Sequence, residues 1–460
     1  DGHEEHPGGS IVPDTKAKIA MLDIKFIREH PDRVRDGLRK KGVQFDLEHL
    51  LGVDERRRAK IQEVEALRTE QNAASDNVAG LDADSREKRV AEMRVLKSKL
   101  GDLAFELKTL EVEFEELMRQ VPNLPLDGVP EGDERSNVVL REAGEKPVFK
   151  FRPQDYVELG SSLDLIDTER AAKVSGSRFG YLKHEAPLLE FALVQFAMGF
   201  LIDLKNIAAA IRAGGLNLSA KPFIPVVPPV LVRPEAMRGM GYAERGSDEM
   251  YRLEKDDLYL VGTSEQSVGP MHGEEVFAED QLPHRHVAFS TCFRREAGSY
   301  GKDTRGILRV HQFDKVEMFS FATPETSRDE HRLLLALEEG LLLALGIPYR
   351  VLEIAAGDLG DPAAAKYDLE AWLPGQNSGQ GEYREVTSTS NTTDFQARRL
   401  GIKVRRKDGS SEFVHMLNGT AFAIGRTLIA ILENYQQEDG SARVPDALRP
   451  YMHGIREIRR

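Results

Sequence analysis

The residue types best suited to chemistry on charged substrates lie in two glycine-containing segments. The first is Phe293-Arg294-Arg295-Glu296, which leads through a glycine-rich loop into a second apolar run at 308–320. Arginine next to glutamate on a strand suits nucleotide recognition, because a guanidinium can fork onto phosphate oxygens and a carboxylate can accept from an amino group. Taken alone, the same pair is more often an inter-strand salt bridge.

The second segment runs from Leu417 to Arg426 and leads into an apolar helical stretch at 427–435. Its small residues let the backbone approach a ligand closely. Arg426 falls at or near the expected helix start, where unpaired N–H groups also favour anions. Helix packing around glycine, with a surface arginine, is the alternative interpretation.

Other familiar sites are not found in the sequence. It has no G-x-x-x-x-G-K-[ST] loop, no convincing G-x-G-x-x-G after a strand, and no G-x-S-x-G elbow. Its histidines are scattered, so we expect no clustered metal site. The one cysteine, Cys292, excludes an intrachain disulfide, fits a reducing compartment and is interpreted as a buried small residue.

The elements that must position these residues begin with two heptad helices. Their apolar positions alternate in spacings of three and four, which predicts an antiparallel hairpin over 54–121 with arms of ~30 residues, roughly 45 Å long. A dimerisation coiled coil, or helices lying on the body, would show the same pattern. Basic residues such as Arg56 and Arg86 would suit a phosphate backbone, but interspersed glutamates fit an ordinary solvated face equally well. The seam consists of Val64, Leu67, Gln71, Ala74, Val78 and Leu81, then Leu96, Leu100, Leu103, Leu107, Leu110, Phe114, Leu117 and Val121.

The rest of the chain divides by composition. Residues 1–20 are expected to be a disordered extension before a natural start at Met21, residues 21–121 an N-terminal domain, and residues 122–150 a Pro/Gly/Asp-rich linker. From 151 to 460 helical runs alternate with short β-branched or aromatic runs, which predicts an antiparallel sheet flanked by helices and an α+β fold class. The net charge of −13 requires any RNA contact to use local basic patches. We expect no secretory signal. We also expect no apolar run of the roughly 20 residues that are needed to cross a bilayer.

Together these motifs resemble a known family. The two segments are similar to motifs 2 and 3 of class II aminoacyl-tRNA synthetases, and 223–232, which contains Pro228-Pro229, resembles motif 1. More specifically, the chain is similar to seryl-tRNA synthetases of bacterial type almost end to end from Met21. Further matching stretches are Glu169–Phe179, Arg384–Asn391, Asp394–Arg399 and Glu433–Gln436.

The resemblance implies an N-terminal coiled-coil arm that grips tRNA and a class II catalytic domain over 151–460. The implied activity is a serine–tRNA ligase, which forms seryl-adenylate from serine and ATP with Mg²⁺ and transfers the seryl group to tRNA(Ser). Charging of tRNA(Sec) is left open. A homodimer through Pro228 and Pro229 and a cytoplasmic location, with no membrane, are also implied. Two alternatives stand: a catalytically inactive paralogue that binds RNA or regulates, and an amino acid:carrier-protein ligase on the same catalytic domain.

The resemblance also implies roles for single residues. Thr263, Ser264 and Glu265 match the serine-recognition segment, Glu317 the carboxylate that accepts from the serine hydroxyl, and Thr420 a residue facing the amino acid. The expected catalytic residues are Arg294, Arg426 and Glu385. Arg294 is expected to clamp the serine carboxylate or the α-phosphate. Arg426 matches the arginine on the γ-phosphate, and Glu385 and Ser388 match the Mg²⁺ ligands. The implied ATP site consists of Arg294, Arg295, Glu296, Phe313, Glu385, Val386, Thr387, Ser388 and Arg426, with Phe313 stacked on adenine and Glu296 facing it.

The chain departs from the family pattern at 375–382, which is a few residues longer than usual. This segment lies close to the expected ATP-binding residues, so it puts their local geometry in doubt.

Overall fold

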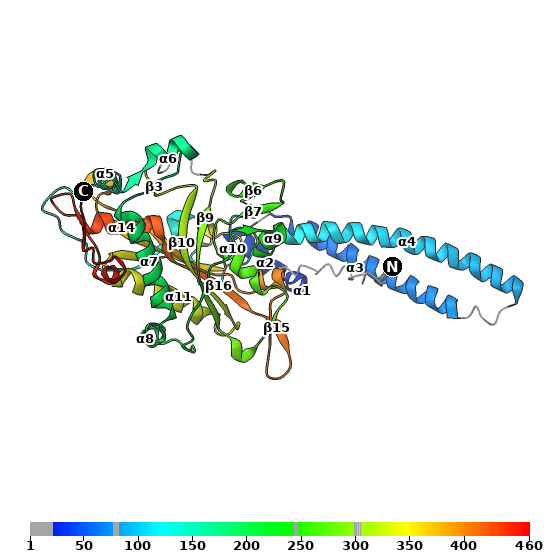
Figure 1. Ribbon diagram of the computed structural model, residues 1–460. Helices are drawn as coiled ribbons and strands as arrows, with labels where there is room; N and C mark the ends of the chain where they lie inside the picture. The colour runs from blue at the N-terminus through cyan, green and yellow to red at the C-terminus, as the bar shows by residue number, and fades with distance from the viewer. Residues whose placement is uncertain (1–21, 77–81, 243–245, 299–300, 302, 304) are drawn as a thin grey trace, which may run out of the picture.

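A long helical arm projects from a larger α/β body in the computed structural model of this chain (Figure 1). The structure describes residues 22–76, 82–242, 246–298, 301, 303 and 305–460. The expected extension at 1–20 lies outside these residues.

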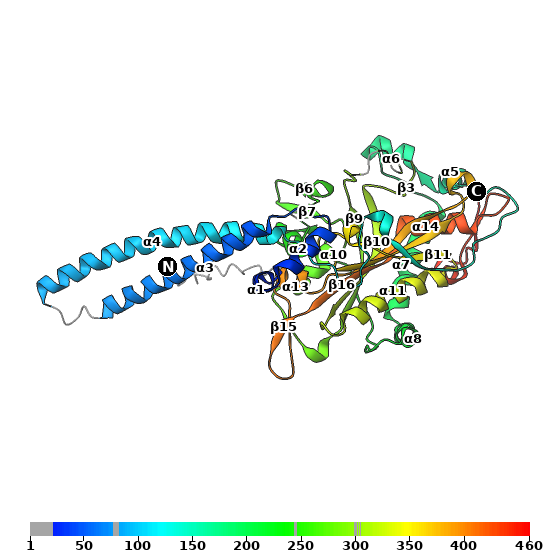
Figure 2. The ribbon, with the colours of Figure 1, turned by 180° about the vertical axis from the view of Figure 1, so that it is seen from behind.

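The arm is the antiparallel hairpin that the heptad pattern predicts. Helix α3 (Leu47–Asp76) pairs along its length with α4 (Ala83–Gln120), and both views show the pair standing clear of the body (Figures 1 and 2). With 38 residues, α4 is about 57 Å long. Asp82 caps its start by accepting from the backbone N–H of Ser85. Val64 and Ala74 are buried in the seam, whereas Val78 and Leu81 lie outside the described residues.

The root of the arm is built from α1 (Ile24–Glu29), α2 (Pro31–Lys40) and the ends of both long helices, around a small core that includes Ile27, Leu50 and Met118. Polar side chains fasten this root to the body, Lys41 and Asn123 among them. Lys41 Nζ donates to the carbonyls of Gly360, Asp361 and Ala363 at 2.9, 3.2 and 2.7 Å, and Asn123 Nδ2 donates to the carbonyls of Pro362 and Thr392 at 2.9 and 2.8 Å.

The body is organised by an eight-stranded sheet, antiparallel except for the parallel pair β4–β9, which confirms the α+β prediction. Six residues of the expected linker form its edge strand β1, whose backbone pairs antiparallel with β11. The strand order is β1 (Val138–Ala143), β11 (Tyr349–Glu353), β12 (Ala365–Leu373), β13 (Glu382–Asn391), β16 (His415–Ala423), β10 (Gln312–Ala322), β9 (His284–Phe293) and β4 (Ile224–Val226).

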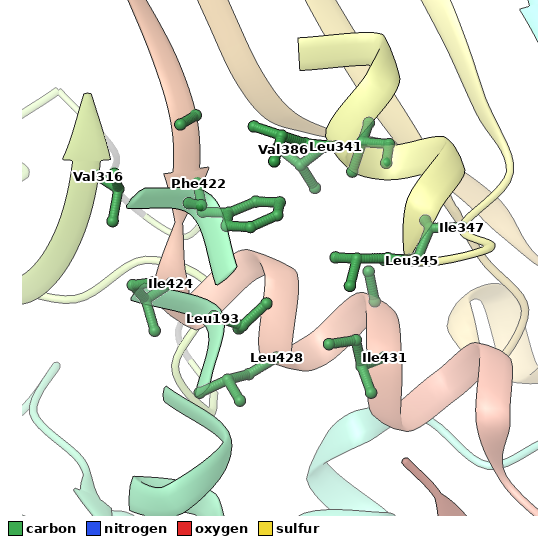
Figure 3. Packing of buried hydrophobic residues seen from close by; sticks show 14 of the residues in the cluster. Leu193, Val316, Leu341, Leu345, Ile347, Val386, Phe422, Ile424, Leu428 and Ile431 are labelled. Atoms are coloured by element: carbon green, nitrogen blue, oxygen red, sulfur yellow. The ribbon is translucent and has the colours of Figure 1, made fainter. Parts of the chain in front are cut away.

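Helices cover one face of this sheet and enclose the main core (Figure 3). Helix α11 (Ser327–Ala344) lies on β13 and β16, and α14 (Ile424–Tyr435) lies on β10 and β12. Leu341, Phe422 and Ile431 meet between them (Figure 3). The remaining α-helices are α5 (Tyr156–Ser162), α6 (Thr168–Ser175), α7 (Glu185–Ile202), α8 (Leu204–Gly214), α9 (Pro234–Met240), α10 (Glu265–Val268), α12 (Gln376–Gly379) and α13 (Phe395–Leu400).

Short elements surround the sheet and carry several site residues. The small strands are β2 (Ile166–Asp167), β3 (Tyr181–Leu182), β5 (Leu231–Val232), β6 (Tyr251–Leu253), β7 (Leu258–Leu260), β8 (Val276–Ala278), β14 (Lys403–Arg405), β15 (Ser411–Phe413), β17 (Ala442–Arg443) and β18 (Glu457–Ile458). The 3₁₀ turns are η1 (Glu134–Ser136), η2 (Ser247–Glu249), η3 (Gly269–His272), η4 (Glu279–Gln281), η5 (Ala356–Asp358) and η6 (Asp446–Tyr451).

Helix α7 differs from the sequence-based expectation about membrane spans. Its 18 residues are long and apolar enough, by length and composition, to cross a bilayer. One side of it, which includes Leu189, Leu193 and Leu201, is buried in the main core, and α7 packs on α14. This is the environment of a core helix in a globular domain.

Candidate active site

The predicted site residues come from four distant segments and meet in one cleft of about 840 Å³ on the sheet face opposite the helices. Of the predicted residues, only Ser264 and Arg295 do not border it. The predicted residues that line the cleft are Thr263, Glu265, Arg294, Glu296, Phe313, Glu317, Glu385, Val386, Thr387, Ser388, Thr420 and Arg426.

Strand β10 runs along the cleft and supplies side chains to its lining. Its side chains alternate between faces, so Phe313, Lys315 and Glu317 all point into the cleft, while Val316 packs beneath in the core. Across the strand pair, Glu317 lies opposite Thr420 on β16. An aromatic ring, a cation and an acid therefore follow one another over roughly 13 Å along one strand.

Glu317 is held by three donors deep in the cleft, and only 3% of the residue is exposed. Thr263 Oγ1 and Ser264 Oγ donate to Oε2 at 2.5 and 2.8 Å, and Lys315 Nζ donates to Oε1 at 2.7 Å. A carboxylate offers about four acceptor positions, which leaves roughly one on Oε1 for a ligand. Thr263 and Ser264 thus fix Glu317 in place, and Ser264 does so from a fully buried position.

Glu265 is a second buried acid at the same end of the cleft. Tyr242 Oη donates to its Oε2 at 2.7 Å and Gln396 Nε2 to its Oε1 at 2.6 Å. Burial, followed by the nearby charge of Glu317, raises the pKa of Glu265 above its usual value. A cationic ligand group placed here would relieve that unfavourable negative charge.

Glu385 and Ser388 reach the same face because β13 is irregular. Residues three apart on a regular strand point to opposite faces. In β13, however, Glu385 pairs with Glu370 and Thr387 with Leu369, so Val386 is an extra, bulged residue and restores the shared face. The side chains of Val386 and Thr387 are directed below the sheet, where Val386 joins the main core and Thr387 Oγ1 donates to Glu338 at 2.9 Å. These two residues border the cleft without offering it a free polar side chain.

Arg426 and Glu385 form an ion pair at the mouth of the cleft. Arg426 Nη1 lies 3.2 Å from Glu385 Oε1 and donates to the Glu385 carbonyl at 3.1 Å. Burial opposes ionisation of Glu385, but Arg426, Lys366 and Arg294 together outweigh it and lower its pKa. The carboxylate is therefore charged and available to a cation at neutral pH.

Arg294 directly follows β9 and lies beside the aromatic part of the cleft. Its Nε donates to the Gly262 carbonyl at 3.1 Å, and its guanidinium carbon lies 5.3 Å from the centre of the Phe313 ring. Arg295 is directed away from the cleft, since its guanidinium carbon lies 5.6 Å from the centre of the Tyr251 ring. Its predicted contact with ATP therefore does not follow from the side-chain position.

Glu296 bends the chain where β9 gives way to the loop. Its φ of 52° is in the left-handed region that few residues other than glycine adopt. Its carboxylate borders the cleft and lies 3.6 Å from Arg309 Nη1, while Arg309 Nε donates to Asp303 at 3.1 Å.

Sequence reasoning missed four residues that shape the site. Lys315 could have been noticed, because it alternates with Phe313 and Glu317 in an apolar strand, and Lys366, which lies 3.0 Å from Asp368 on β12, follows the same pattern. Tyr242 and Gln396 hold Glu265 from segments far apart in sequence and carry no local signal.

Comparisons with known proteins agree with this architecture. The family model described as "tRNA synthetase class II core domain (G, H, P, S and T)" matches residues 249–435, which contain the cleft strands β9, β10, β13 and β16. The sheet, the cleft and its arginines thus define the catalytic domain of a class II aminoacyl-tRNA synthetase.

The remaining comparisons identify the family. A model for the seryl-tRNA synthetase N-terminal domain matches residues 21–125. Serine–tRNA ligases of Acidothermus cellulolyticus and Clavibacter michiganensis are 48% and 45% identical, over 94% and 95% of this chain and 98% and 97% of theirs. The chain belongs to the seryl-tRNA synthetase family, and its activity is that of a serine–tRNA ligase.

Solved structures show the same fold with nucleotides. Seryl-tRNA synthetase from Pyrococcus horikoshii complexed with ATP has a TM-score of 0.83 and 38% identity, covering 95% of this chain and 99% of that one. The cytoplasmic serine–tRNA ligase of Naegleria fowleri in complex with AMP has a TM-score of 0.80 and 32% identity with the same coverage. Both matches include the arm as well as the catalytic body.

Proposed function

We propose that the cleft holds ATP and serine end to end along β10 and that its residues act by alignment and charge compensation. The observation that carries this proposal is the order Phe313, Lys315, Glu317 on one face of the strand, with Arg294 and Arg426 on the cleft walls. The ATP and AMP bound in the two related structures support a nucleotide site in this chain.

Each end of ATP meets a group of suitable chemistry. Phe313 offers a flat apolar face for adenine, and Glu296 an acceptor for its amino group. Arg294 lies between this region and the serine pocket, so it is placed to clamp the α-phosphate or the serine carboxylate. Arg426 serves the γ-phosphate and gives up its contact with Glu385 to do so.

The oxygen donors of Glu385 and Ser388 are suited to bind Mg²⁺. The bulge at Val386 gives both an oxygen donor on the cleft face, and Glu385 remains ionised because its pKa is lowered. Bound there, Mg²⁺ would neutralise phosphate charge and favour departure of pyrophosphate.

The reaction then needs no protein nucleophile. A carboxylate oxygen of serine attacks the α-phosphorus, the bond to the bridging oxygen of pyrophosphate breaks, and seryl-adenylate forms. Both reactants are anionic, so the arginines offset their repulsion and keep them in line. The 3′ hydroxyl of tRNA next attacks the seryl carbonyl and releases AMP.

Serine is selected by the two buried acids. Glu317 accepts from the serine hydroxyl with its remaining position on Oε1, Thr420 closes the pocket from β16, and Glu265 balances the ammonium group. Alanine would leave Glu317 without its partner, which a pocket built for a hydroxyl strongly disfavours.

We further propose that residues 21–121 form the tRNA-binding domain and 151–460 the catalytic domain, joined through 122–150. The arm extends well beyond the body and carries basic residues, among them Arg56 and Arg86, that suit the backbone of tRNA(Ser). Whether tRNA(Sec) is charged depends on the same arm. We place the reaction in the cytoplasm, as the name of the Naegleria relative states for that protein.

A homodimer through motif 1 completes the proposal. Pro228 and Pro229 follow the edge strand β4, whose outer side carries no further strand in the sheet that the structure describes. Apolar side chains next to them are solvent-exposed, with Val227 at 79% and Ile224 at 44%. An apolar sheet edge of this kind is suited to burial against a second copy.

Pyrophosphate exchange with each of the twenty amino acids tests the activity. Serine alone should support rapid exchange, and only with ATP and Mg²⁺. Exchange with another amino acid in place of serine would overturn the assignment of Glu317 and Glu265.

A further inference from the structure

Three imidazoles gather outside the cleft, where η3 ends and β9 begins. His272, His284 and His286 each have a ring nitrogen within 4.8 Å of those of the other two. None of the three borders the active-site cleft. The sequence-based expectation of scattered histidines is therefore wrong here, because the chain folds His272 back onto a strand that begins twelve residues later.

One pair of ring nitrogens in the cluster has the spacing of metal ligands. His272 Nε2 and His286 Nε2 are 3.2 Å apart. In a tetrahedral zinc site with Zn–N distances of about 2.0–2.1 Å, neighbouring nitrogens are roughly 3.3–3.4 Å apart. The pair can thus share one ion with only a small adjustment of the rings.

The groups around the cluster orient these nitrogens. Glu275 Oε2 lies 2.8 Å from His272 Nδ1, so the carboxylate can accept that proton and leave Nε2 free for the centre of the cluster. A carboxylate behind a ligating histidine is the common arrangement in zinc sites. Ile224 on β4 pairs with His286 in the sheet, and the buried His286 Nδ1 has no hydrogen-bond partner in the part of the chain that the structure describes.

Aromatic packing is the competing explanation for the cluster. Phe277 and Phe321 lie against it, with ring centres 5.1 and 5.2 Å from that of His272. Lys221 adds a positive charge near His284, although its Nζ is bonded to the carbonyls of Asp280 and Leu282 at 2.6 and 3.0 Å. Packing explains the rings, and a hydrogen bond between the two imidazoles explains the 3.2 Å contact of their Nε2 atoms. Neither explains why a ring nitrogen of His284 also lies within 4.8 Å of those of His272 and His286.

We propose that His272, His284 and His286 form a binding site for one divalent transition metal, with Zn²⁺ the best match to three nitrogen donors. A fourth position faces solvent through the half-buried His272 and His284. The ion ties η3, which follows the serine-pocket helix α10, to β9, whose other end leads directly to Arg294. It acts as a structural brace and takes no part in the adenylate reaction.

The test uses the full-length, untagged chain with His3→Gln and His6→Gln, which removes two N-terminal histidines as competing ligands. Zn²⁺ binding is measured by calorimetry, and Co²⁺ binding by its visible absorption. We expect one ion per chain and a tetrahedral Co²⁺ spectrum. His284→Gln and His272→Gln should each weaken Zn²⁺ binding at least tenfold, while His49→Gln, an exposed imidazole on the arm, should leave it unchanged.

Thermal unfolding separates binding from folding. Without metal, His284→Gln should unfold close to the parent temperature, since the residue is only half-buried. With Zn²⁺ the parent and His49→Gln should gain stability, and His284→Gln should not. Equal gains in all three proteins, equal Zn²⁺ affinities, or no binding to the parent would each overturn the proposal. Serine-dependent pyrophosphate exchange is measured separately and is expected without added Zn²⁺.

Discussion

Replacement of Glu317 offers the sharpest test of how serine is recognised. Glu317→Gln keeps the shape of the side chain but removes its charge. The serine hydroxyl then loses a hydrogen bond to a carboxylate, which contributes about 1.5–3 kcal/mol. Preference for serine over alanine in pyrophosphate exchange should therefore fall by roughly 10- to 150-fold.

The same change also affects folding, and the structure indicates how to separate the two effects. Lys315 Nζ lies 2.7 Å from Glu317 Oε1 with both residues almost fully buried, so the single variant leaves a buried cation without its partner charge. Breaking such a pair costs about 3–5 kcal/mol of stability. The double variant Lys315→Gln with Glu317→Gln removes both charges and should recover much of that loss in denaturant unfolding.

The assay compares kcat/KM for serine and alanine in the parent, the single variant and the double variant. Lost selectivity in both variants, with stability regained only in the double variant, is the expected pattern. An unchanged ratio of serine to alanine in the folded double variant would refute the role of Glu317.

The other predictions concern the charges of the cleft and the arm. Arg294→Ala and Arg426→Ala should each lower pyrophosphate exchange about 10²- to 10³-fold, as loss of one preorganised donor does elsewhere, and a normal rate in either would contradict the phosphate assignment. Because Arg426 helps to hold the pKa of Glu385 low, the parent carboxylate stays charged until the pH falls through that lowered pKa. In Arg426→Ala the pKa of Glu385 in the enzyme without ATP rises, so the acid limb of kcat/KM for ATP, which reports the free enzyme, should move to higher pH; an unmoved limb would show that ionised Glu385 is not required. Replacing 61–105 by a short Gly-Ser turn, just beyond the Lys60–Glu106 ion pair, should abolish tRNA charging but spare exchange. Charging that survives this deletion would remove the arm from tRNA binding.

The fold and most of the site could be predicted from the sequence where a local pattern carries the information. The heptad spacing predicts the arm, and alternation places Phe313 and Glu317 on one face of a strand. The register of a strand is not predicted by such a local pattern, because it depends on pairing with another strand. The bulge at Val386 decides that Glu385 and Ser388 share the cleft, and nothing in Glu385–Ser388 itself indicates it.

Contacts between distant segments were equally hidden. Tyr242 and Gln396 reach Glu265 only after three separate elements have packed together. The edge strand β1 lies within 122–150, whose Pro, Gly and Asp content predicts a linker, and it gains its structure from pairing with β11. The histidine cluster was hidden for the same reason, since the sequence gives spacing along the chain and not proximity in space.

The fastening of the arm root has a mechanical consequence. Lys41 and Asn123 donate hydrogen bonds to backbone carbonyls within 360–363, and residues 360–363 also line the reaction cleft. The arm is about 57 Å long, so a tilt of about 5° about this attachment moves its tip by roughly 5 Å. The attachment itself shifts by only a fraction of that distance. A displacement far out on the coiled coil is therefore accompanied by a much smaller one at residues 360–363, which form part of the wall of the cleft.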